Sequence, residues 1–197
     1  MRTLCFATHN THKLKEIQNI LGNEVNLLTL GQIGCFDEIE EPFDTIAANS
    51  EVKARFIWER YKIDNFADDS GLVIPALNGE PGVRSARYAG PERDDKANIR
   101  LVWERLRGLD TRAYFVTIIT LILDGNTYVF EGRAYGNILF EEKGENGFGY
   151  DPVFLPEEGS GLTFAEMSLD EKSKISHRAK AFNALKEFLQ DKLFPET

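Results

Sequence analysis

Residues 112–135 read RAYFVTIITLILDGNTYVFEGRAY, and this stretch decides the fold class. Two apolar runs, 112–123 and 127–135, flank the segment Asp124-Gly125-Asn126. An Asp-Gly step between runs rich in β-branched and aromatic residues is a strong hairpin signal, because glycine accepts the positive φ that the turn requires. We therefore predict a long hairpin in the middle of the chain.

Around the hairpin, predicted strands alternate with predicted helices. In the helix predicted over 43–61, Ile46, Ser50, Lys53 and Ile57 share one side, which puts Lys53 at the edge of a buried face. The other strands are predicted at 2–7, 24–30 and 65–75, the last broken by a turn at Asp69-Ser70-Gly71, and the other helices at 13–22, 92–107 and about 177–192. This order predicts an α/β fold with a mixed sheet.

The charge balance limits the classes of partner. The 197 residues include 23 basic and 32 acidic side chains, which gives a net charge of −9. A nucleic-acid binder usually carries an excess of Lys and Arg, so we expect no nucleic-acid partner. An acidic protein that binds an anion needs a concentrated positive site or a metal ion.

Cysteine content and hydropathy predict a cytoplasmic protein. Only Cys5 and Cys35 are present, too few for a disulfide framework at this length, so reduced thiols are expected. The longest apolar stretch, Tyr114 to Leu123, spans about ten residues and is too short to cross a bilayer. The start of the chain has no signal-peptide core.

The first polar constellation is Thr8-His9-Asn10-Thr11-His12-Lys13, between a predicted strand and a predicted helix. The free N–H groups and positive dipole end of a helix N-terminus suit phosphate, so all six residues are candidates for substrate binding. The alternative is an Asn or Thr that only caps a surface helix. A metal site on His9 and His12 lacks a nearby third ligand.

The second constellation is the pair Asp68-Asp69 at the end of an apolar strand. Strand alternation directs the two carboxylates to opposite sides, so one can face a ligand. Mg²⁺ takes one or two carboxylates and completes its shell with water and substrate phosphate, and Glu40 or Glu41 could supply the second carboxylate. The alternative is a turn, which all four residues of Asp68-Asp69-Ser70-Gly71 favour.

Two further constellations lie in the second half of the chain. Residues 147–152 (GFGYDP) combine glycines that permit close backbone approach with a ring for stacking, or they form a glycine turn with core aromatics. Lys172 and Ser176-His177-Arg178 adjoin the last predicted helix. They could contact an anion or a base, or Ser176 could be an N-cap with solvated basic neighbours.

Taken together, these motifs resemble the inosine triphosphate pyrophosphatase family, whose members act on non-standard purine nucleoside triphosphates. The resemblance runs nearly end to end. It rests on Thr8-x-Asn10-x-x-Lys13, ADDSGL at 67–72, GEPGVRSARYAG at 79–90, FGYDPVF at 148–154 and EKSKISHRAKA at 171–181. His9 departs from the family pattern, which commonly has Gly between its Thr and Asn.

The resemblance implies a long mixed β-sheet with flanking helices and two lobes around a central substrate cleft, in a single pyrophosphatase domain over 1–197 that is often a homodimer. Asp69 would bind Mg²⁺ and help to activate water, with Glu40 or Glu41 as the second metal carboxylate. The triphosphate would be held by Thr8, Asn10, Lys13, Lys53 and Ser70. The base and sugar would be received by Phe148, Gly149, Tyr150, Asp151, Lys172, His177 and Arg178.

The expected reaction is hydrolysis of inosine, deoxyinosine or xanthosine triphosphate to the monophosphate and pyrophosphate. No residue has the setting of a covalent nucleophile, so water is the expected attacking group. Two alternatives stay open: a related pyrophosphatase that prefers pyrimidine or modified bases, and a nucleotide-binding regulator without turnover.

Overall fold

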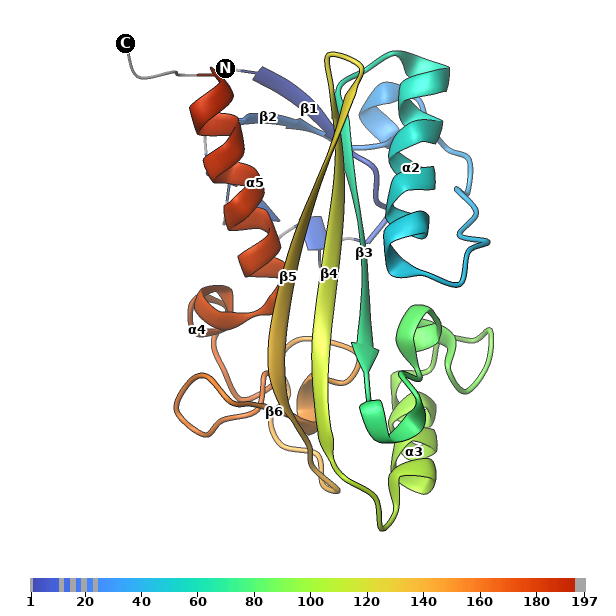
Figure 1. Ribbon diagram of the computed structural model, residues 1–197, viewed down its shortest axis with the longest axis vertical. Helices are drawn as coiled ribbons and strands as arrows, with labels where there is room; N and C mark the ends of the chain where they lie inside the picture. Colours follow the sequence, from blue (N-terminus) through green and yellow to red (C-terminus); the bar gives the residue numbers. More distant parts are fainter. Residues whose placement is uncertain (1, 11–12, 15–16, 19–20, 23–24, 194–197) are drawn as a thin grey trace. The chain divides into compact units, whose positions relative to one another are not determined.

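The computed structural model describes residues 2–10, 13–14, 17–18, 21–22 and 25–193. The strands are β1 (Arg2–Phe6), β2 (Val25–Leu28), β3 (Asn65–Val73), β4 (Arg112–Leu123), β5 (Asn126–Ile138) and β6 (Phe154–Pro156). The helices are α2 (Ile46–Tyr61), α3 (Asp95–Leu106), α4 (Leu169–Ile175) and α5 (His177–Leu193) (Figure 1). Residues 13–14, 17–18 and 21 are also helical, within the helix predicted over 13–22.

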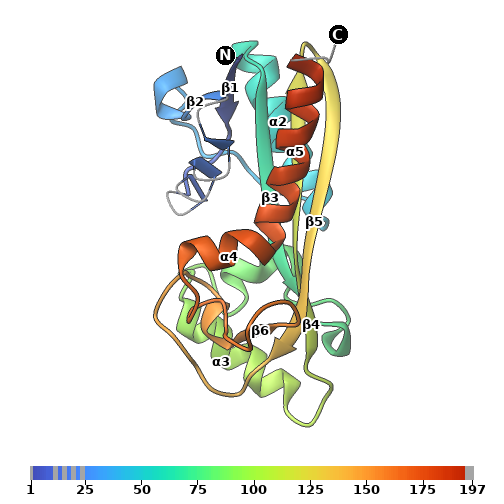
Figure 2. The same ribbon diagram turned by 90° about the vertical axis from the view of Figure 1, so that its left-hand side faces the viewer.

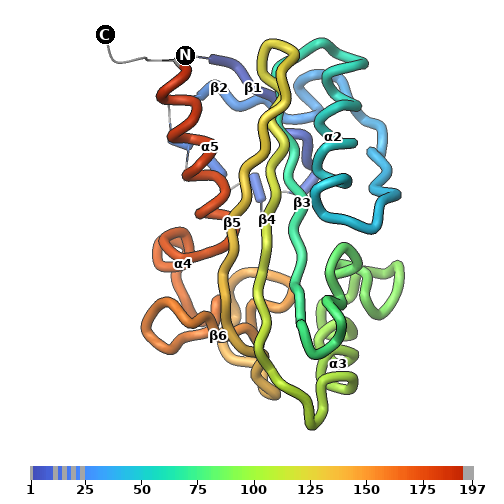
Figure 3. Tube along the Cα trace, viewed as in Figure 1, coloured from blue at the N-terminus to red at the C-terminus, as the bar shows by residue number. Residues whose placement is uncertain are grey.

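The strands form one six-stranded mixed sheet in the order β2-β1-β3-β4-β5-β6. Strand β1 is parallel to β2 and to β3, whereas β5 and β6 are antiparallel. Strands β4 and β5 are neighbours joined only by Asp124 and Gly125, both at positive φ, and Figure 3 traces the hairpin. The predicted α/β fold with a mixed sheet is confirmed.

The predicted turn at Asp69-Ser70-Gly71 is wrong. Strand β3 continues through these residues to Val73, and seven of its nine residues are buried. Burial in the middle of a sheet overrides the local preference of Asp, Ser and Gly for turns.

The chain divides into two compact units, which we describe separately. Unit 1 comprises Met1–Asp69, Thr117–Gly132 and Arg178–Thr197, and unit 2 comprises Ser70–Val116 and Arg133–His177. Within the described part of the chain, no helix is both long enough and apolar enough to cross a membrane.

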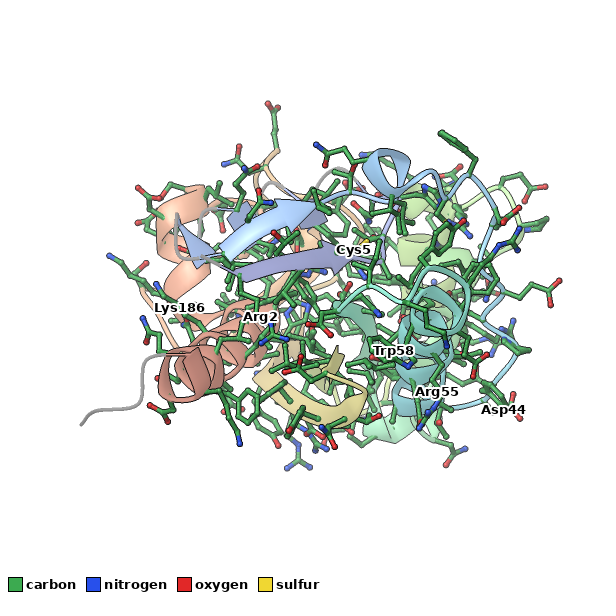
Figure 4. All side chains as sticks on the ribbon, turned by 90° about the horizontal axis from the view of Figure 1, so that it is seen from above. Arg2, Cys5, Asp44, Arg55, Trp58 and Lys186 are labelled. Carbon is green, nitrogen blue, oxygen red and sulfur yellow. The ribbon has the colours of Figure 1, made fainter. Side chains whose placement is uncertain are left out.

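In unit 1, helices cover both faces of the strands (Figures 1 and 2). Phe66 of β3 packs with Phe6 and with Phe182 of α5, whereas the next residue, Ala67, packs with Ala54 and Ile57 of α2. This alternation is the period-2 pattern of a strand buried on both faces. Figure 4 shows Cys5 in the interior and Arg55 of α2 at the periphery.

In unit 2, the core is built around three aromatic rings. Phe115 of β4 contacts Phe154 of β6 edge-on at a centroid separation of 4.7 Å, and Phe154 lies 5.1 Å from Phe164. Helix α3 adds Ile99 and Val102 to this core. The unit also contains α4, which the sequence analysis did not predict.

Candidate active site

The carboxylate of Asp68 lies at the centre of a buried ionic cluster in unit 1. Its Oδ2 is 2.8 Å from Lys13 Nζ and 4.0 Å from Arg178 Nε, and the side chain of Asp68 is fully buried. Burial works to raise the pKa of Asp68, but Lys13, Arg178 and Lys53 together hold it below its ordinary value. Asp68 is therefore an anion that three cations keep ionised.

Asp69 has a different environment because strand alternation turns it to the α2 side of β3. Its Oδ1 lies 4.0 Å from Lys53 Nζ. Burial raises the pKa of Asp69 to about 6, although Lys53 and Lys13 oppose the shift, and Glu41 and Asp68 add to it. Two adjacent carboxylates thus have pKa values shifted in opposite directions, which is a frequent property of functional acids.

Lys53 contacts both acidic segments of unit 1, namely the Asp68-Asp69 pair and Glu41. Its ammonium donates to the backbone oxygen of Asp68 at 2.7 Å and forms an ion pair with Glu41. Burial works to lower the pKa of Lys53, but Asp69, Asp68 and Glu41 raise it. The predicted position of Lys53 at a buried helix edge is confirmed. Of the two glutamates considered, Glu41 lies in this cluster, whereas Glu40 is exposed.

The loop after β1 has the geometry of a helix cap. The backbone N–H of Lys13 donates to Asn10 Oδ1 at 3.2 Å, and the N–H of Asn10 donates to Thr8 Oγ1 at 3.1 Å. The capping role of Asn10 is therefore observed, and it orders the start of the helical segment from which Lys13 reaches Asp68. Thr11 and His12 lie outside the described residues.

His9 is exposed, and its Nε2 lies 3.3 Å from the backbone oxygen of Asp37. Its ring therefore contacts the segment that leads to Glu41.

Two buried residues of α2 were missed by the sequence analysis as functional candidates. Asn49 exchanges two hydrogen bonds with the backbone of Phe43, and Ser50 Oγ donates to the backbone oxygen of Ala67 at 3.0 Å. Ser50 Oγ also lies 2.9 Å from Thr120 Oγ1. The available signal was that polar residues occupy the helix face that carries Lys53.

Unit 2 contains a second buried ion pair. Lys172 Nζ lies 2.8 Å from Asp151 Oδ2, with side-chain exposures of 7% and 5%. The same oxygen accepts from the N–H of Phe148 at 2.9 Å, and the ammonium lies 5.4 Å from the Phe148 ring centroid. The pair therefore fixes both the backbone and the ring of Phe148.

The other predicted residues of unit 2 have mixed environments. Gly149 donates its N–H to Asp95 Oδ2 at 2.8 Å, whereas Tyr150 belongs to the core and donates its hydroxyl to Ser85 O at 2.8 Å. The alternative of a core aromatic thus holds for Tyr150. Ser70 is half-buried in β3.

The basic side chains around Ser176 are not solvated: His177 and Arg178 are each 3% exposed. Ser176 is the C-cap of α4, where its N–H donates to Lys172 O at 2.9 Å. The His177 ring stacks on Phe115 at 4.6 Å with an interplanar angle of 13°, and Arg178 is buried beside Asp68. The alternative that these basic side chains are solvated is wrong, because the aromatic core and the carboxylate provide partners for them.

Two carboxylates of unit 1, those of Asp69 and Glu41, are donors of the kind that a divalent metal ion uses. Among the described residues, no three His, Cys, Asp or Glu side chains gather as a metal-binding group. Asp69 and Glu41 both approach Lys53, and Asp69 is a buried acid that a nearby cation would help to ionise. One or two carboxylates completed by phosphate and water are the usual protein ligands of Mg²⁺.

The fold and this cluster define a class: an α/β protein with a mixed sheet that holds lysines, an arginine and carboxylates around one strand, an arrangement suited to a polyphosphate. A family model described as the Ham1 family matches residues 4–188, and the chain belongs to the Ham1 family.

Named homologues align with this chain over nearly its full length. The dITP/XTP pyrophosphatase of Christiangramia forsetii is 50% identical over 187 residues, which cover 94% of this chain and 98% of that protein. The dITP/XTP pyrophosphatase of Porphyromonas gingivalis is 47% identical, with 96% and 98% covered. A solved structure of a HAM1 protein from Coxiella burnetii has a TM-score of 0.90 and 35% identity, with 97% and 100% covered.

Proposed function

We propose that this protein hydrolyses non-standard purine nucleoside triphosphates, namely inosine, deoxyinosine and xanthosine triphosphate, to the monophosphate and pyrophosphate. The observation that carries the proposal is the ionic cluster of Lys13, Lys53, Asp68, Asp69 and Arg178 in a chain 50% identical to a dITP/XTP pyrophosphatase. The cluster places three cations side by side in a protein whose net charge is −9, and carboxylates hold these cations in place.

The triphosphate is assigned to the cations of unit 1. Lys13 and Lys53 have buried stems and ammonium groups, so each can donate to phosphate oxygens from a fixed position. Asn10 caps the helical turn that carries Lys13, and Thr8 offers a hydroxyl in the loop before it. Asp68 keeps Lys13 and Arg178 in place and prevents three buried cations from repelling one another.

Asp69 is assigned the two remaining roles, metal ligand and proton acceptor. A water oxygen attacks the α-phosphorus, the bond from that phosphorus to the bridging oxygen breaks, and pyrophosphate leaves. Without a metal, the pKa of Asp69 is raised to about 6, so its carboxylate is largely ionised near neutral pH and can bind a cation or accept a proton. Mg²⁺ bound by Asp69 and Glu41 would supply charge neutralisation at the phosphates.

For unit 2, we propose that Phe148, Lys172 and His177 contact the base and sugar. Lys172 and Asp151 hold the Phe148 ring, and an aromatic face stacks on any base. We further propose a homodimer and a cytoplasmic location, where the nucleotide pool is found; the two cysteines are free and buried, in keeping with reduced thiols.

The test is product analysis in ¹⁸O-labelled water with Mg²⁺ and a panel of inosine, xanthosine, adenosine, guanosine and uridine triphosphates. Phosphorus NMR should show monophosphate and pyrophosphate from the first two substrates, with ¹⁸O in the monophosphate. Label in the pyrophosphate would place the attack at the β-phosphorus. Preference for uridine triphosphate would favour a pyrimidine enzyme, and no turnover of any substrate would favour a regulator.

A further inference from the structure

Helix α2 presents a buried polar row, Asn49, Ser50 and Lys53, toward the strands of unit 1. Lys53 and Ser50 bond to β3, but Asn49 bonds to the segment that precedes the helix. Its Oδ1 accepts from the N–H of Phe43 at 2.9 Å, and its Nδ2 donates to the oxygen of Phe43 at 3.0 Å. The amide thus uses both of its groups on one residue, which fixes that backbone in position and orientation.

The clamped residue lies only two positions after Glu41. The intervening residue is Pro42, whose ring fixes its own φ and restricts the residue before it to extended conformations. A single residue of restricted conformation, Pro42, therefore separates Glu41 from the backbone that Asn49 holds. Asn49 is 1% exposed, whereas Phe43 is 48% exposed, so the buried amide holds a segment that solvent would otherwise loosen.

The same helix also contacts the carboxylate of Glu41 directly. Lys53, one turn after Asn49, pairs with Glu41 and donates to Asp68 O at 2.7 Å, and it lies 4.0 Å from Asp69. Helix α2 therefore contacts both the Glu41 segment and the Asp68-Asp69 segment, through side chains spaced by one helical turn.

We propose that Asn49 is a positioning residue that holds the backbone beside Glu41, so that the carboxylates of Glu41 and Asp69 can bind one divalent cation. The chemistry of that cation rests on the proposed function, whereas the clamp itself does not. Loss of a group that orients a metal ligand typically weakens metal binding by about 10- to 100-fold.

The test compares Asn49→Leu with Thr45→Ala. Asn49→Leu removes both amide groups at similar volume. Thr45 caps α2 by accepting from the N–H of Ala48 at 3.2 Å, so its loss weakens the start of the same helix and leaves the clamp intact. Each variant is titrated with Mn²⁺ alone by electron paramagnetic resonance, and hydrogen exchange is followed at the Phe43 amide.

Asn49→Leu should raise the Mn²⁺ dissociation constant by about tenfold or more and speed exchange at Phe43 by a similar factor, whereas Thr45→Ala changes each less than about twofold. Equal losses in the two variants, or unchanged Mn²⁺ affinity in Asn49→Leu, would overturn the proposal. If the wild-type protein cleaves no triphosphate but the Mn²⁺ and exchange results hold, the positioning role stands and the proposed function fails.

Discussion

Lys13 Nζ and Asp68 Oδ2 lie 2.8 Å apart, and this pair ties the loop after β1 to the middle of β3. The two residues are 55 positions apart in sequence, so the contact exists only in the folded chain. Because Arg178 and Lys53 also act on Asp68, its carboxylate compensates three cations at once. A buried carboxylate with this role should dominate the electrostatic stability of unit 1.

Asp68→Asn should therefore destabilise the protein by about 3 kcal/mol at pH 7, because it leaves buried cations uncompensated. The pKa of Asp68 is lowered by folding, so its contribution is present above the unfolded pKa and is lost as the pH falls through the lower folded value. The deficit of the variant should shrink below about pH 4. Urea unfolding across pH measures it. Glu51→Gln, at the exposed pair with Arg55, is the control and should cost under about 0.5 kcal/mol.

Asp69→Asn should have the opposite effect on stability. Folding raises the pKa of Asp69 from 3.8 to about 6, so the protonated form favours the fold, and wild-type protein loses stability as the pH rises through about 6. The amide cannot ionise. In EDTA the variant should be more stable than wild type by up to about 3 kcal/mol at pH 8, and equal to it near pH 4.

The same variant should lose activity by on the order of 10² or more, because it removes a group that stabilises charge in the transition state. Steady-state kinetics with inosine triphosphate at saturating Mg²⁺ checks this. A variant that is more stable and keeps most of its activity would remove Asp69 from the mechanism and leave only an electrostatic role for it.

Gly147→Ala should disturb the Phe148 segment of unit 2. Gly147 has φ of 75°, and an added Cβ would lie 2.0 Å from Asp151 Oδ2, the oxygen that binds Lys172 and Phe148 N–H. Gly161 has a similar φ of 79° with open space around it. Gly161→Ala should cost about 1 kcal/mol for the backbone alone. Thermal unfolding should show a clearly larger loss for Gly147→Ala, and equal losses would mean that Asp151 moves freely.

The sequence predicted the elements whose signals are local. The Asp-Gly turn of the β4–β5 hairpin and the buried position of Lys53 on α2 both follow from spacing. The opposite directions of Asp68 and Asp69 followed from strand alternation once β3 was recognised. Local composition misled at Asp69-Ser70-Gly71, because the burial that keeps these residues in a strand comes from distant parts of the chain.

What could not be predicted depends on contacts between distant segments. Asn49 is an ordinary polar helix residue until Phe43 folds against it. Helix α4 has only seven residues, and its capping box of Ser168 and Glu171 was the local signal that was overlooked. The roles of the site residues in binding and catalysis stay predictions.

Two roles compete for Arg178, and kinetics on two nucleotides can separate them. Its Nε lies 4.0 Å from Asp68 Oδ2, so it supports the ionic cluster whatever the substrate. The family resemblance also implies contact with the base. Inosine has a carbonyl at the purine 6-position and adenosine has an amino group, and a guanidinium can only donate hydrogen bonds. A donor at that position therefore accepts the first base and rejects the second.

Arg178→Ala should lower kcat/KM for both nucleotides through Asp68, and the loss for inosine triphosphate should exceed that for adenosine triphosphate by about tenfold or more. Phe148→Ala is the control: a stacking ring contributes affinity without choosing the base, so both substrates should weaken by similar factors. Steady-state kinetics of the two variants on both nucleotides gives the ratios. Equal losses in Arg178→Ala would assign Arg178 to the support of Asp68 alone, and the residue that reads the 6-carbonyl would then lie elsewhere.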